Sequence, residues 1–141
     1  MTGGLLERRA RVREWRHEPR EAGPLMDETL RRVASEAVRY RPSSPPDLLV
    51  VRMDEPLTPP ERAGIGGRLL PSAVLEMTPG FVPQLVARRW GFDGGAMCLV
   101  GGRETDEAAD EIVESFAESG LVVSRLSLRG GACERRIEWN V

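Results

Sequence analysis

Two short apolar runs, each preceded by a helical pattern, constrain the fold of this chain more than any other feature. The runs are Asp47–Val51 and Ala96–Val100, both bounded by turn residues, and the second contains neither charge nor proline. Such runs are typical of strands in a parallel sheet that is covered on both faces. Strands that alternate with helices favour right-handed crossovers. We therefore predict an α/β fold with a mixed, mostly parallel sheet and helices packed on its faces.

Three amphipathic segments predict the helices. They are Met26–Tyr40, a segment that begins near Thr78-Pro79 and reaches Trp90, and a segment that Thr105 caps and that ends at Ser119. In the second, proline is expected at the first helical position. In the first, one apolar stripe at three- and four-residue spacing is formed by Leu30, Val33, Ala34, Ala37 and Val38.

The remaining segments complete the predicted order of elements. Residues 54–70 hold three prolines and three glycines and predict a loop. Leu121–Leu128 and Cys133–Val141 are expected to be strands, the last one antiparallel, joined by a Gly130-Gly131 turn. Leu5–His17 fits either a short helix or an edge strand, because its apolar residues partly alternate with arginine.

The length, charge and cysteine content of the chain limit which class of protein it can belong to. At 141 residues it is near the commonest size of a single domain, and its net charge is −2. All twenty basic residues are Arg, and ten of them lie among the first 41 residues against seven acids, which we interpret as a solvated face, not a nucleic-acid site. We expect a cytoplasmic protein with reduced cysteines and no membrane segment. With one His and two Cys, we expect neither a metal nor a cofactor.

The segment Leu69–Gly102, LLPSAVLEMTPGFVPQLVARRWGFDGGAMCLVGG, combines a proline-led loop, a helix, a Gly-Gly turn and an apolar strand. With the earlier PDLLVV, it resembles the N-terminal half of a β-ketoacyl synthase of the thiolase superfamily. The resemblance covers about Met26–Val141, while residues 1–25 match weakly. It implies one thiolase-like half domain over residues 1–141 with a five-stranded sheet, in which residues 5–17 supply a strand.

The resemblance also implies that catalysis is lost. Aligning Gly94-Gly95 with the glycine turn of the family places the nucleophilic cysteine near Gly102–Glu104, where Arg103 is the expected occupant. The half that carries the family's histidines is absent. The chain therefore resembles a pseudoenzyme, and we expect no catalytic residue and no condensation of acyl thioesters.

Cys98 is the one candidate nucleophile outside the family position. Free Cys in an apolar strand commonly acts as a small hydrophobic residue, and Cys133 is interpreted in the same way. The opposing hypothesis is a small thioester-processing enzyme in which Cys98, Glu76 or Asp93 acts, or in which His17 activates Cys98.

The third helical segment bears on whether this half stands alone. Its apolar side is expected to hold Ala108, Ala109, Ile112, Val113, Phe116 and Ala117. Its other side is expected to hold Asp106, Glu107, Asp110, Glu111, Glu114 and Glu118. An acidic outer side indicates that this helix meets water, as a stand-alone half requires.

The resemblance implies an accessory protein in polyketide or fatty-acid type biosynthesis. Partners would be a second copy, a ketosynthase-like subunit or an acyl carrier protein. The family pairs the strand before its nucleophile across a two-fold axis, so the expected interface is Ala96, Met97, Cys98, Leu99 and Val100, unless this is a central strand. Arg88 and Arg89 are the candidate carrier contact, or are simply solvated. A structural protein without a small-molecule ligand is a third hypothesis.

Overall fold

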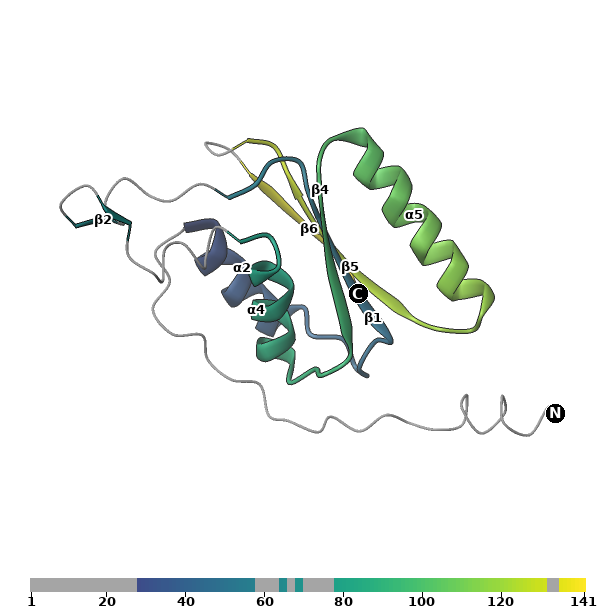
Figure 1. Cartoon of the computed structure of the whole chain (residues 1–141). Helices are drawn as coiled ribbons and strands as arrows, with labels where there is room; N and C mark the ends of the chain where they lie inside the picture. The colour runs from purple at the N-terminus through teal and green to yellow at the C-terminus, as the bar shows by residue number, and fades with distance from the viewer. Residues whose placement is uncertain (1–27, 58–63, 66–67, 70–77, 132–134) are drawn as a thin grey trace.

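The sheet is mixed and open, with the strand order β4-β1-β5-β6 (Figure 1). The computed structural model describes residues 28–57, 64–65, 68–69, 78–131 and 135–141. The strands are β1 (Leu48–Met53), β4 (Gly95–Val100), β5 (Val123–Arg129) and β6 (Arg136–Asn140). Strand β1 is parallel to β4 and β5, and β6 is antiparallel to β5. The prediction that the two apolar runs are neighbouring strands is confirmed, since Val50 is opposite Met97.

The predicted fold class is thus confirmed at the level of an α/β chain with a mixed sheet, but the strand count is not. The sheet of the described residues has four strands, not five. The fifth predicted strand, residues 5–17, lies outside the described part of the chain. The prediction of a loop over residues 54–70 is also wrong in part. Two short strands, β2 (Gly64–Ile65) and β3 (Arg68–Leu69), pair there as an antiparallel ribbon, and the two-residue Gly-Gly spacing between them in the sequence is typical of a hairpin.

The helices cover the two faces of the sheet unequally. They are α2 (Glu28–Arg39), α4 (Phe81–Trp90) and α5 (Arg103–Glu118). Helices α2 and α4 lie side by side on one face, and α5 lies alone on the other (Figure 1). The chain passes from β1 to β4 through α4 and then back across β1 to β5 through α5. Because these two right-handed crossovers run in opposite directions along the sheet, α4 and α5 lie on opposite faces.

Two predicted helix starts are corrected. Helix α4 begins at Phe81, after a Gly80 cap, so Pro79 precedes the helix. Helix α5 begins at Arg103, because the chain turns earlier, at Gly101 with its positive φ of 146°. Thr105 therefore lies inside the first turn and does not cap the helix.

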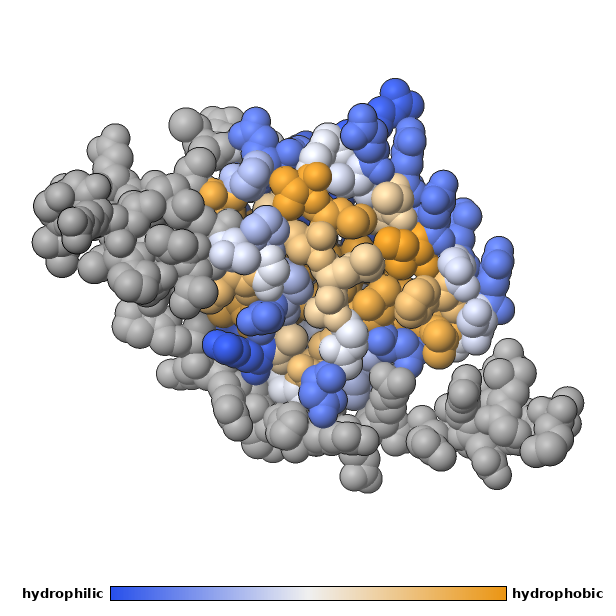
Figure 2. Space-filling view, viewed as in Figure 1, coloured by the Kyte–Doolittle hydropathy of each residue, from blue (hydrophilic) through white to orange (hydrophobic). Residues whose placement is uncertain are grey.

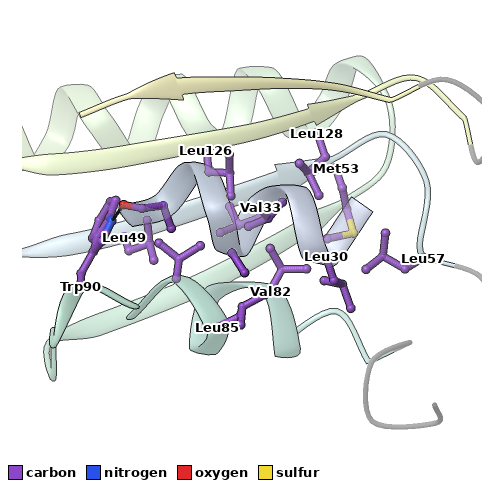
Figure 3. Packing of buried hydrophobic residues seen from close by; sticks show 14 of the residues in the cluster. Leu30, Val33, Leu49, Met53, Leu57, Val82, Leu85, Trp90, Leu126 and Leu128 are labelled. Atoms are coloured by element: carbon purple, nitrogen blue, oxygen red, sulfur yellow. Dashed lines mark hydrogen bonds between the residues drawn. The ribbon is translucent and has the colours of Figure 1, made fainter. Parts of the chain in front are cut away.

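The main core lies between the sheet and the pair α2 and α4 (Figure 3). Alternate residues of β1 and β5 point into it, and the apolar stripe of α2 packs against them. Val38 is the exception among the predicted stripe residues, since 53% of its surface is exposed. Fully or almost fully buried members are Leu30, Val33, Leu49, Val51, Met53, Val82, Val86, Trp90, Leu126 and Leu128.

Candidate functional site: the open edge of strand β4

Strand β4 is an edge strand. In the part of the chain that the structure describes, it pairs with β1 alone. The alternative of a central strand is therefore wrong for these residues. The expected interface, Ala96–Val100, lies wholly within this edge strand.

Within the described part of the chain, the backbone of β4 has polar groups at this edge that pair with no other strand. The N–H of Gly101 donates to the carbonyl of Met53 in β1 at 3.0 Å. Because backbone groups alternate direction along a strand, the groups of Leu99 and Met97 also point to β1. The N–H and C=O groups of Ala96, Cys98 and Val100 then point away from the sheet, which is the template for another strand.

The side chains around this edge are apolar and incompletely covered. Met97, Cys98 and Leu99 are half-buried, and Val100 exposes 38% of its surface. Figure 2 shows a hydrophobic area over β4 that continues toward α5 and stops at the hydrophilic outer side of that helix. In α5 the half-buried apolar side chains are Ala108, Ile112, Val113 and Phe116, whereas Ala117 is exposed, so its predicted place on the apolar side of the helix is wrong. Such an exposed apolar area is a feature of surfaces that bind other proteins.

Cys98 is poorly suited to nucleophilic chemistry. Its side chain packs against the core between the sheet and α2 and α4, and burial raises the pKa of its thiol to about 11. At neutral pH only about one thiol in ten thousand would then be ionised, and the thiolate is the nucleophile. Asp93 lies five residues before it, or about 16 Å along an extended chain. His17, Glu76 and Cys133 lie outside the described residues.

Arg103, the residue that the resemblance aligns with the family's nucleophile, is the first residue of α5. This side chain is 92% exposed and forms an ion pair with Glu107 at 3.7 Å, one helical turn later. The nearby hydroxyl of Thr105 donates to the carbonyl of Gly102 at 2.6 Å. Because this hydroxyl is already hydrogen-bonded to the backbone of the helix, residues 101–105 offer no free nucleophile.

An ion-pair network beneath this turn was not predicted. Arg52, at the end of β1, is fully buried, and its Nε donates to Thr105 Oγ1 at 3.2 Å. Its guanidinium also pairs with Asp54 and lies 3.4 Å from Asp106. Asp106 accepts further hydrogen bonds from Arg129 at 3.0 Å and Arg125 at 3.2 Å. Asp106 therefore faces the sheet, and its predicted place on the solvent side of α5 is wrong.

The network lowers the pKa values of both carboxylates. Hydrogen bonds from Arg129 lower the pKa of Asp106, and the neighbouring charge of Arg52 adds to the effect. The backbone N–H of Gly130 is the largest cause that lowers the pKa of Asp54, followed by Arg52. These groups are already paired with one another, so the arrangement ties α5 to the sheet. Arg125 and Arg129 lie four residues apart and so on one face of β5, but the predicted strand ended at Leu128 and did not include Arg129.

The candidate carrier contact lies at the other end of the sheet. Arg88 and Arg89 occupy the last turn of α4, which ends where the chain turns into β4. Arg103 follows β4, so the two sites are separated by the length of that strand. The structure therefore does not bring Arg88 and Arg89 together with Arg103.

Comparisons with known proteins assign no family. No protein-family model matches the sequence, no curated protein resembles it significantly, and no solved structure matches the fold. Among the described residues, no helix is long and apolar enough to cross a membrane, and no group of three or more acidic, His or Cys side chains could hold a metal ion.

Proposed function

We propose that this chain is a non-catalytic binding protein that assembles through the open edge of β4. The partner strand is that of a second copy or of a ketosynthase-like subunit, in an assembly line of polyketide or fatty-acid type. The observation that carries the proposal is the combination of outward-pointing backbone groups and uncharged side chains in one edge strand. The biosynthetic setting is supported by the sequence resemblance alone.

The direction of the backbone groups favours one register for self-association. A two-fold axis at Cys98 would place Cys98 opposite its own copy, and Ala96 opposite Val100 of the second copy. All three outward-pointing residues would then form hydrogen-bonded pairs, for which antiparallel Cα atoms lie about 5.5 Å apart. The same patch would serve both subunits, as a closed two-fold dimer requires.

The raised pKa of the Cys98 thiol argues against the alternative of a small thioester-processing enzyme. So does the exposed arginine at the family's nucleophile position, which offers no group that could be acylated. The proposal therefore expects no covalent adduct when the protein is incubated with an acyl thioester and its intact mass is measured.

Light scattering coupled to gel filtration tests the proposed assembly with a matched pair of variants. Val100→Lys places a charge beside the outward edge, whereas Val122→Lys places it at a more exposed valine before β5. We expect wild-type protein and Val122→Lys to be dimers at micromolar concentration and Val100→Lys to be a monomer. A wild-type monomer that captures no ketosynthase-like subunit would refute the proposal.

The register has its own test. With Cys98 and Cys133 replaced by Ser, mild oxidation of the double variant Ala96→Cys with Val100→Cys should link two chains, because both positions are exposed and the facing Cα atoms at about 5.5 Å lie within disulfide range. Ala96→Cys with Val122→Cys should give no cross-link, because Val122 lies before β5 and away from the interface. A dimer that forms normally but never cross-links would overturn the register while leaving the interface in place.

A further inference from the structure

The end of the molecule opposite the N-terminus of α5 gathers arginine and aromatic side chains. Helices α2 and α4 both finish there, and the indole N–H of Trp90 donates to the carbonyl of Ala37 at 2.8 Å, which ties the two helix ends together. Trp139 of β6 completes the cluster. Its ring stacks on Tyr40 with centroids 5.9 Å apart and lies 6.1 Å from the ring of Trp90.

Arginine surrounds these rings. The guanidinium of Arg39 lies 5.6 Å from the centre of the Tyr40 ring, and Tyr40 exposes 38% of its surface. Arg88 is exposed and Arg89 half-buried in the last turn of α4. No ion pair within the described part of the chain involves Arg39, Arg88 or Arg89. The nearest acids in the chain are Glu36 and Asp93.

Two buried hydrogen-bond donors at this end lack an acceptor. They are Nε of Arg89 and Nε1 of Trp139. A buried donor without an acceptor costs about 1–3 kcal/mol, so most such groups in native proteins have a partner. Both atoms are closed off from solvent, and Nη1 of Arg52 and Nε of Arg125 in the ion-pair network also lack an acceptor among the described residues, so these donors do not by themselves identify a binding partner.

The distribution of charge over the helices indicates which kind of ligand this end of the molecule attracts. Helices α2 and α4 together carry five Arg and two Glu, whereas α5 on the opposite face carries one Arg and seven acids. Carboxylates are thus attracted to the α2 and α4 side. Trp, Tyr and Arg are also the residue types that contribute most to binding energy in protein interfaces.

We propose that this arginine and aromatic end, formed by Arg39, Tyr40, Arg88, Arg89 and Trp139, binds an acidic segment of a partner protein. Carboxylates of the segment pair with the guanidinium groups of Arg39, Arg88 and Arg89, and an apolar side chain covers the exposed part of Tyr40. From the proposed function this inference takes only that the chain works by binding proteins. It does not require pairing through β4, which lies on a different edge.

Fluorescence anisotropy with a labelled acidic peptide of Glu, Asp and Leu tests the proposal on the full chain. We expect saturable binding that weakens as salt is raised. Arg88→Gln and Arg89→Gln should each weaken it roughly 2- to 5-fold, because each removes one positive charge that pairs with the segment. Arg136→Gln is the matched control, since it removes the same charge from an exposed residue of β6, and it should bind as wild type does.

Three outcomes would overturn the inference: no saturable binding, an equal loss in Arg136→Gln, or tighter binding of a single-stranded oligonucleotide with the same dependence on Arg89. If Arg89→Gln fails to fold, Arg39→Gln replaces it, with an expected loss of similar direction. The peptide should bind Val100→Lys as it binds wild type, so failure of the β4 proposal and failure of this one are distinguishable.

Discussion

The two edge strands of the sheet, β4 and β6, differ in composition far more than in exposure. Strand β4 reads GAMCLV and has no charged residue, whereas β6 reads RIEWN and alternates polar with apolar residues. The polar residues of β6 share one face, where Glu138 accepts a hydrogen bond from Arg129 at 2.7 Å. The apolar residues, Ile137 and Trp139, pack against the core on the other face.

This difference shows what each edge is suited to. Charged side chains on an edge strand oppose pairing with another chain, because pairing would bring them close to the charges of the incoming strand. Strand β6 has that protection and β4 lacks it. A chain that protects one edge and leaves the other apolar is therefore expected to bind through the unprotected one. The following predictions test this contrast, beginning with the largest expected effect.

Proline substitutions at adjacent positions of β4 should have opposite consequences. Met97→Pro removes an N–H that points to β1, and a lost ladder bond with ring strain should destabilise the fold by about 3 kcal/mol or more. Ala96→Pro removes an N–H that points outward, so the fold should persist while self-association is lost. Urea unfolding and light scattering measure the two effects. Equal destabilisation by both variants would show that the assigned backbone directions are wrong.

Asp106→Asn should loosen α5, which flanks β4 but not β6. The change removes the charge that three arginines share, including the fully buried Arg52, and breaking such a pair costs about 3 kcal/mol. Hydrogen exchange should rise in α5 and β4 before it rises in β6. Glu107→Gln, which alters an exposed pair of the same helix, is the control and should change stability by less than about 0.5 kcal/mol.

The same network predicts a dependence on pH. Because the pKa values of Asp54 and Asp106 are lowered in the folded state, their stabilisation is present above the unfolded value of about 3.9 and is lost as pH falls through the folded values. The urea midpoint of the wild type should therefore fall below about pH 4. The difference from Asp106→Asn should shrink over the same range, and a constant difference would contradict the assignment.

The smallest expected change in stability comes from removing the protection of β6. Arg136→Val with Asn140→Val replaces two exposed side chains and should alter the free energy of unfolding by less than about 1 kcal/mol. Light scattering should nevertheless show species larger than a dimer, because both edges would then accept a strand. If light scattering gives the same molar mass for the double variant as for the wild type, then polar side chains are not what prevents β6 from pairing with another chain.

The elements of the fold were largely predictable because their signals are local. The apolar stripe of α2 and the apolar run of β1 each lie within a single element, and both elements lie close to their predicted bounds. The strand order was not predictable in the same way, since β1 is central only because β4 and β5 join it from opposite sides. The network around Arg52 and Asp106 joins three elements, so periodicity within one segment could not reveal it. The edge character of β4 was predictable in part, from an uncharged run, whereas the cluster around Trp139 needed the tertiary fold.

The central position of β1 also determines the order in which the chain can fold as it is synthesised. Its two neighbours lie about forty and seventy residues further along the sequence. Closing such long loops is slow, because contacts distant in sequence carry a large entropic cost before they stabilise anything. Strand β1 and the uncharged β4 must both leave the ribosome before β5 can complete the sheet. We therefore expect the nascent chain to depend on molecular chaperones until residues 123–129 have emerged.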